Sequence, residues 1–470
     1  MEIDPSLKTL VLGAMGGYVV LAFALAAYAQ RQVKSAEDYV VAGRRLPLWL
    51  AAPTLLATWF GAGTLMTATD EVRARGIHAA TLDPIGAGLC LVIAAFVIAK
   101  PLWKMKLTTL SDFYRARFDR RVEQLSAVMM VPSYFGWIAA QFMVLSEMLE
   151  LFGGIPIAWG LVLVAFVGVG YTLMGGMWAV TLTDAVQMII VVVGLVFLTG
   201  TVMSELGEGA WDGLVQVWQR TTPDRRALIE PSFLAWFSVL CAGALGNLPM
   251  QDVGQRIFAS RSARVAQWAC LLAGVGYLVL GLMPMSLGLA AHLIGTEGQS
   301  TLSLLAAHFL TPGLAVMFVL VLMSVILSTI DSAILAPATV ISQNLVLPRM
   351  KGASALRVNR IAVLVVGVIS LGVSFAGESA YGLLEAAYEL GMVSLLVPLL
   401  FGLSRWRSST AALGAMIGGF VVWLGHLVAS QEGFVGTELP IGLSCMLLAA
   451  LIYLVIYRGA SRTRRPDYAS

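Results

Sequence analysis

The chain has 470 residues, of which 59% are apolar and only 12% are charged. Its mean hydropathy of +0.84 excludes a soluble globular domain and indicates a membrane protein that crosses the bilayer many times. The net charge of +3 gives no reason to expect nucleic acid as a partner, because the basic residues lie mostly in short loops between apolar stretches.

About thirteen apolar stretches have the roughly twenty residues that an α-helix needs to cross a hydrocarbon core. They lie at residues 9–29, 48–70, 80–100, 123–149, 156–174, 178–202, 232–252, 265–292, 313–346, 358–376, 379–403, 410–430 and 438–457. We therefore predict an all-α polytopic membrane protein with about 13 transmembrane helices.

Basic residues are distributed unevenly between the two sides of this layout. If every stretch crosses once, most of the 30 Lys and Arg residues fall on the same side as the C-terminus, and the positive-inside rule places that side in the cytoplasm. We expect the N-terminus outside, the C-terminus in the cytoplasm, and a multi-pass protein of the cell membrane, of the bacterial inner-membrane type.

Two of the apolar stretches are interrupted, and they occupy corresponding places in the two halves of the chain. Residues 54–64 (TLLATWFGAGT) contain two glycines, and residues 241–251 (CAGALGNLPMQ) contain glycines and Pro249. Lipid cannot hydrogen-bond a freed peptide group, so broken membrane helices persist where they line a cavity. Paired breaks predict a transporter whose substrate site lies near the bilayer midplane.

Acidic and hydroxyl side chains inside the apolar stretches form a second candidate feature. Asp184 begins the sixth stretch and Asp331 lies in the ninth, where ionisable groups are costly and therefore indicate function. Ser328 and Ser332 share one helix face, with Thr329 beside them. Such oxygens are the ligands that a hard cation such as sodium takes. The alternative is that the hydroxyls bond back to carbonyls of their own helix.

Three segments resemble the sodium:solute symporter family. They are residues 171–187 (YTLMGGMWAVTLTDAVQ), 255–267 (QRIFASRSARVAQ) and 327–346 (LSTIDSAILAPATVISQNLV). The resemblance implies a transporter rather than an enzyme, with one transmembrane domain over residues 1–470 and an inverted five-helix repeat that includes both broken helices. In that layout residues 9–47 hold an extra helix and loop, 48–202 the first repeat, 232–403 the second repeat, and 404–470 the C-terminal helices and tail.

The family's main sodium site, carried over by position, consists of backbone carbonyls at the first break and of groups on the ninth stretch. Here these are the carbonyls of Ala57, Phe60 and Val325 and the hydroxyls of Ser328 and Thr329. Some members bind a further sodium ion at positions that match Asp184, Asp331 and Ser332, and a second ion remains an open alternative here.

Within the family, residues 57–72 and 245–260 resemble the branch of high-affinity choline transporters. Those carriers hold a quaternary ammonium group with tryptophans, through cation–π attraction. Trp59 and Trp137 match two of the tryptophan positions, whereas the third position holds Met250. A thioether has no strong quadrupole to hold a cation, which argues against choline itself as the solute.

Four further residues near these tryptophans are candidates for binding the solute. Gly61 lies in the first break, and Gln141 lies one helical turn after Trp137, on the same face. Asn247 and Gln251 flank the second break. Their amides either bind the solute or satisfy backbone groups that the break leaves free.

Together these features predict a sodium-coupled secondary symporter that imports a small organic solute by alternating access, with Na+ as the coupling ion. The residues leave a cationic and a zwitterionic solute open, and the bilayer is the only other partner that we expect. Two alternatives remain. One is a proton-coupled carrier that titrates Asp184 or Asp331, and the other is a transporter-like membrane sensor that works with a signalling partner.

Overall fold

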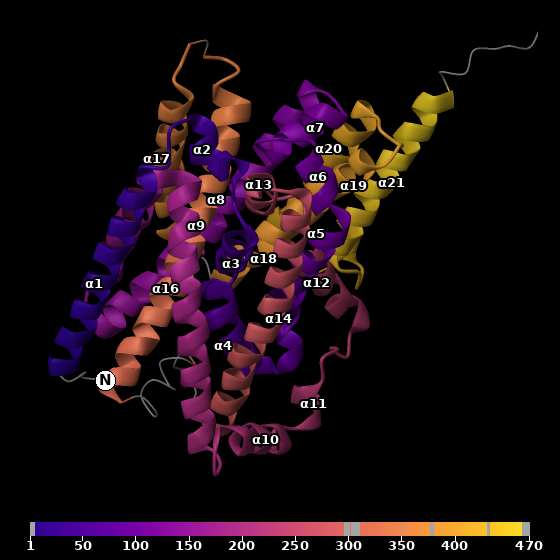
Figure 1. Ribbon diagram of the computed structural model, residues 1–470. Coiled ribbons are helices and arrows are strands. Elements are labelled where there is room, and N and C mark those ends of the chain that lie inside the picture. The colour runs from indigo at the N-terminus through magenta and orange to yellow at the C-terminus, as the bar shows by residue number, and fades with distance from the viewer. Residues whose placement is uncertain are drawn as a thin grey trace, which may run out of the picture.

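The computed structural model describes residues 5–295, 301, 311–350, 352–376, 380–429 and 433–462. Within these ranges the chain is helical apart from its loops (Figure 1). Ten described helices are long and apolar enough to cross a membrane, or eleven if the bent pair Leu48–Trp59 and Gly63–Arg75 is one span. The prediction of an all-α polytopic membrane protein is confirmed, although this count is lower than thirteen.

The elements fall into bundle helices and connecting helices. The bundle helices are α1 (Pro5–Gln30), α3 (Leu48–Trp59), α5 (Ala87–Val97), α8 (Arg120–Gly153), α9 (Ile157–Glu205), α12 (Phe233–Leu245), α14 (Ala263–Ile294), α16 (Pro312–Val340), α17 (Ala355–Ser374), α18 (Ala380–Gly391), α20 (Ser409–Val428) and α21 (Ile441–Arg462). The connecting helices are α2 (Ala36–Val41), α4 (Ala68–Arg75), α6 (Ala99–Lys104), α7 (Leu110–Arg117), α10 (Ala210–Arg220), α11 (Pro223–Arg226), α13 (Gln251–Ala259) and α19 (Val397–Leu403).

One of the predicted spans that this count leaves out is merged into α9. This element has 49 residues, about 74 Å at 1.5 Å per residue, whereas a hydrocarbon core is about 30 Å thick. Its backbone leaves the helical region at Gly176, with φ 51° and ψ −137°, between the predicted spans 156–174 and 178–202. A Cβ atom there would lie 2.4 Å from the carbonyl oxygen of Tyr39, so both the conformation and the contact require glycine.

Both predicted interruptions are present. α3 ends at Trp59, and the chain continues from Gly63 after a bend of 57°. α12 ends at Leu245 after only 13 residues, and α13 begins at Gln251, so the predicted span 232–252 is divided and escapes the count. α3 contacts α9, α13, α14 and α16, which places the first break inside the bundle.

Candidate functional site

The carbonyl oxygen of Ala57, in the last turn of α3, faces two hydroxyl groups of α16. Ser328 Oγ donates to it at 3.1 Å, and Thr329 Oγ1 lies 3.5 Å away. The same two hydroxyls lie 2.9 and 3.1 Å from the carbonyl oxygen of Val325 in their own helix. Four of the five predicted sodium ligands therefore gather at one place between α3 and α16. The fifth, Phe60, is the C-cap residue that directly follows α3.

Gly61 brings the first break into contact with this cluster. A Cβ atom at Gly61 would lie 2.6 Å from Thr329 Oγ1 and 3.1 Å from Gln141 Oε1, so only glycine permits this approach. Gln141 Oε1 also accepts a hydrogen bond from the backbone nitrogen of Ala62 at 2.9 Å. The predicted solute-binding amide thus satisfies a backbone donor at the break, as buried backbone groups require.

The acidic residues of the possible second ion site are buried next to the same helices. Asp184 accepts a hydrogen bond from the Thr54 hydroxyl of α3, while its Oδ1 has no hydrogen-bond partner. Asp331 accepts from Ser332 Oγ at 3.1 Å and from Thr183 Oγ1 at 3.4 Å. The structure therefore brings together Asp184 on α9 with Asp331 and Ser332 on α16. An unpartnered carboxylate oxygen in the interior is costly, and a cation offsets that cost.

Arg256 of α13 joins this acidic cluster, and the sequence analysis did not single it out. Its side chain is 1% exposed. Nη2 donates to Ser332 Oγ, and Nη1 donates to the backbone oxygen of Asp252 at 3.1 Å. The predicted span ended at residue 252, which assigned Arg256 to a cytoplasmic loop. The division of that span into α12 and α13 instead carries Arg256 into the interior.

The two predicted tryptophans are linked by two residues that the sequence analysis missed. Trp59 Nε1 donates a hydrogen bond to Asp252 Oδ2, and Tyr134 donates to Asp252 Oδ1 at 2.6 Å. The Tyr134 ring lies 5.9 Å from the Trp137 ring, between centroids. Both tryptophans are buried, at 4% and 8% exposure. The sequence could have identified Asp252, because it is an acidic residue directly after the second break, where a buried charge indicates function.

The two amides at the second break have different surroundings. Gln251 Oε1 accepts from the backbone nitrogen of Leu110 at 2.7 Å, and its Nε2 lies 3.4 Å from the backbone oxygen of Thr108. This geometry favours the alternative in which Gln251 satisfies backbone groups, here at the start of α7. Asn247 is buried, and so is Met250, whose sulfur lies 3.4 Å from the Cβ position of Gly391 in α18.

Tyr277 of α14 satisfies the backbone carbonyl that the first break frees. Its hydroxyl lies 2.8 Å from the Trp59 oxygen and 2.8 Å from Asp83 Oδ1, and it also contacts Thr64. Thr64 Oγ1 donates to the same Asp83 oxygen at 2.8 Å. These contacts hold the break in place from the α14 side, and Tyr277 was not predicted.

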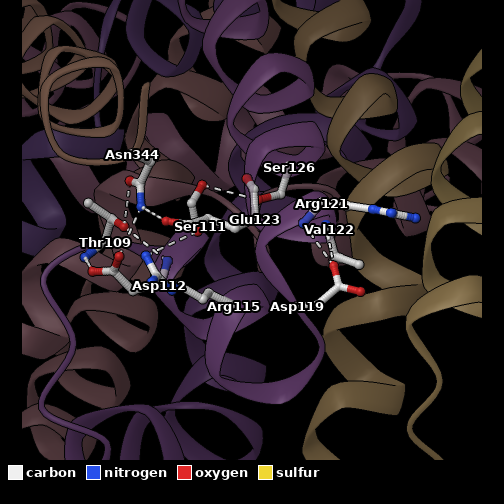
Figure 2. A network of polar contacts seen from close by, with 10 residues as sticks. All are labelled: Thr109, Ser111, Asp112, Arg115, Asp119, Arg121, Val122, Glu123, Ser126 and Asn344. Atoms are coloured by element: carbon white, nitrogen blue, oxygen red, sulfur yellow. Dashed lines mark hydrogen bonds and ion pairs between the residues drawn. The ribbon is translucent and has the colours of Figure 1, made fainter. Parts of the chain in front are cut away.

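Figure 2 shows a polar network that ties α7 and α8 to the segment after α16. Asn344 Nδ2 donates to Asp112 Oδ1 and to Glu123 Oε1, both at 2.9 Å, and Asn344 Oδ1 accepts from Thr109 at 2.8 Å. Glu123 is 2% exposed and lies 3.5 Å from Arg115. These contacts fasten together parts of the chain that are more than 200 residues apart.

Replacing Asn344 by alanine should destabilise the protein, because two acidic side chains lose a donor. Hydrogen bonds to charged groups contribute about 1.5–3 kcal/mol each, so we expect a clearly lower midpoint of thermal unfolding in detergent. Ser126→Ala is the matched control, since its hydroxyl reaches only the edge of the network, at 3.1 Å from Ser111. Equal midpoints for the two variants would contradict the stabilising role of Asn344.

A family comparison covers most of the chain. The model of the sodium:solute symporter family matches residues 39–421. The chain belongs to the sodium:solute symporter family. It is accordingly a sodium-coupled solute symporter and a multi-pass membrane protein, and it is a transporter rather than an enzyme.

The symporter has distant relatives with known names. It is 26% identical over 416 residues to the high affinity choline transporter 1 of Homo sapiens. This alignment covers 81% of the symporter and 69% of the human protein. It is 26% identical over 481 residues to the sodium/pantothenate symporter of Escherichia coli (strain K12), covering 93% and 94%.

Solved structures share the fold of the symporter. A Na+-coupled sialic acid symporter in a substrate-bound outward-open state has a TM-score of 0.81 at 18% identity, with 97% of this chain and 98% of that chain covered. A nucleobase-cation-symport-1 family transporter in a closed conformation has a TM-score of 0.60 at 14% identity, covering 90% and 95%.

Proposed function

We propose that this symporter imports a small organic solute, cationic or zwitterionic, between its two broken helices, and that sodium binds where α3 meets α16. The observation that carries the proposal is the contact of the Ser328 and Thr329 hydroxyls of α16 with the Ala57 carbonyl of α3, next to the first break. Back-bonding within α16 accounts for the contacts to Val325, but it does not account for a contact to another helix.

The proposed sodium ligands are five oxygens, contributed by Ala57, Phe60, Val325, Ser328 and Thr329. All are uncharged, so the ion keeps its full positive charge, and the membrane potential acts on it. Moving one positive charge inward through 100 mV yields about 2.3 kcal/mol, enough for roughly fifty-fold accumulation of the solute. An ion at this place joins α3 to α16 and thereby stabilises a state that is open to the outside and ready for the solute.

A second sodium ion at Asp184, Asp331 and Ser332 is part of the proposal. The unpartnered Oδ1 of Asp184 supports it, as does the position of both acids between α3, α9 and α16. The hydroxyl of Thr58 lies 3.1 Å from Ser332 Oγ, which adds another oxygen from the helix that carries the main site.

The proposed solute site lies around the two breaks. Its residues come from both broken helices and from α8. They are Trp59, Gly61, Trp137, Gln141, Asn247 and Met250, with Gln251 set apart from them by its contacts to α7. The choline transporters among the relatives support an amine-containing solute, while Met250 departs from the tryptophan that those carriers have.

We further propose thirteen spans with the N-terminus outside and the C-terminus in the cytoplasm of a bacterial-type inner membrane. Two inverted repeats, residues 48–202 and 232–403, would each begin with a broken helix. The kink at Gly176 and the division of α12 from α13 support this layout, because they supply spans that a count of unbroken helices leaves out.

Counterflow in proteoliposomes tests the transport proposal. Labelled choline, glycine betaine and pantothenate are offered at fixed pH with equal sodium on both sides, and then with potassium in place of sodium. We expect exchange of at least one solute that sodium stimulates and potassium does not. Exchange that is equally fast in sodium and in potassium would instead indicate proton coupling, and binding without exchange would indicate a sensor.

A further inference from the structure

Asp252 lies where the two broken helices meet, at the second residue of α13. Its carboxylate accepts hydrogen bonds from Trp59 of the first break and from Tyr134 of α8, and its side chain is 1% exposed. We infer that Asp252 binds the positive charge of the solute, and that the solute is an amine cation without a carboxylate group. This inference rests on the proposed function and narrows its solute class.

Among the residues that the structure describes, no basic side chain forms a salt bridge with the carboxylate of Asp252. Within the described ranges no Lys, Arg or His nitrogen lies within 4.0 Å of it. Arg256 is one helical turn further along α13, but its guanidinium donates to Ser332 Oγ and to the backbone oxygen of Asp252. Arg256 is therefore directed toward the acidic cluster on α16. A buried charge needs a partner. The Arg256 charge acts on Asp252 without a salt bridge, and the two side chains that donate hydrogen bonds to the carboxylate are neutral.

The buried charges around the two breaks are predominantly negative. Asp83, Asp184, Asp252 and Asp331 are all buried, and among the described residues Arg256 is the single Lys or Arg in that class. In the proposed function, sodium and Arg256 balance the charges of Asp184 on α9 and Asp331 on α16. Arg256 makes no hydrogen bond to the Asp252 carboxylate, so a cation that enters with the solute has an acidic partner there.

The surroundings of Asp252 also restrict the solute chemically. Trp59 and Tyr134 contact the carboxylate, and the Trp137 ring lies against the Tyr134 ring, so a cation beside Asp252 has aromatic side chains next to it as well. Each carboxylate oxygen accepts one hydrogen bond from these residues and can accept another. A full negative charge in a low-dielectric site attracts a cation more strongly than a ring quadrupole does. The Asp252 charge therefore compensates for the tryptophan that is replaced by Met250. A zwitterion would bring its own carboxylate toward Asp252, and the two would repel each other.

Binding measurements on the full-length protein test this inference. The probes are choline, ethanolamine and tetramethylammonium as cations, glycine betaine as the zwitterion, and 3,3-dimethyl-1-butanol as the neutral isostere of choline. We expect the unmodified protein to bind at least one cation more tightly than betaine and the isostere. Asp252→Asn should weaken that cation at least thirty-fold and leave the neutral isostere within three-fold, while Asp252→Glu should retain most of the cation affinity.

Tyr134→Phe is the control for a merely structural role, because it removes one hydrogen bond from the carboxylate and leaves the charge. It should change the affinities for cation and isostere by the same factor. Thermal stabilisation by sodium over potassium, measured in parallel, reports the ion site separately. If sodium does not stabilise the unmodified protein more than potassium does, the proposed function is contradicted. If sodium does stabilise it, three results would overturn the inference alone. They are an unchanged cation affinity in Asp252→Asn, an equal loss of affinity for the cation and the neutral isostere in that variant, and an unmodified protein that binds betaine more tightly than the cations.

Discussion

Replacing Ser328 and Thr329 together by alanine is expected to abolish sodium-stimulated uptake while the protein still folds. Two of the five proposed ligands are lost, and a contact to a charged group contributes about 1.5–3 kcal/mol. The apparent affinity for sodium should therefore fall by roughly two orders of magnitude or more. Folding should persist, because alanine is the best helix former and both positions lie inside α16. Uptake as a function of sodium concentration in proteoliposomes measures the effect.

Ser370→Ala is the matched control for this double variant. Ser370 is a buried serine of the neighbouring helix α17, and its hydroxyl has no hydrogen-bond partner. It should show the sodium dependence of the unmodified protein. A double variant with normal sodium activation would refute the assignment of the ion site, whatever its uptake rate.

Hydropathy and glycine placement were sufficient to predict the helical bundle and both interruptions. A span needs about twenty apolar residues, and this requirement is visible in a single sequence. The glycines of residues 54–64 and the Pro249 segment marked backbone that cannot remain helical in lipid, and α3 and α12 do end there. The gathering of Ser328 and Thr329 at Ala57 followed the family resemblance, since those positions are far apart in the chain.

Other parts of the site depend on contacts that no local pattern encodes. Asp252 meets Trp59 across 193 positions of the chain, and Tyr277 meets the Trp59 carbonyl across 218. Arg256 was assigned to a loop because apolar length does not reveal where a broken helix resumes. The direction of the Gln251 side chain depends on the rotation of α13 about its axis, which contacts with α7 determine.

Trp59→Ala is expected to weaken solute binding far more than Trp59→Phe does. Phenylalanine keeps an aromatic face for a cation, worth about 0.5–2 kcal/mol, but it loses the N–H group that donates to Asp252. We therefore expect Trp59→Phe to be intermediate, with roughly a tenfold loss of affinity, and Trp59→Ala to lose about a hundredfold or more. Equilibrium binding of a labelled amine cation in the presence of sodium measures the series.

The relative losses of solute affinity in Trp59→Phe and Trp59→Ala separate the role of the ring from that of its N–H group. If the ring supplies only bulk, leucine at position 59 should bind the cation as well as phenylalanine does, so Trp59→Leu is the control of similar size. If the N–H group alone matters, all three variants should lose affinity equally. Only a cation held against an aromatic face beside a carboxylate gives the order Trp, Phe, Leu, Ala, and the same series with 3,3-dimethyl-1-butanol should then show no preference for Phe over Leu.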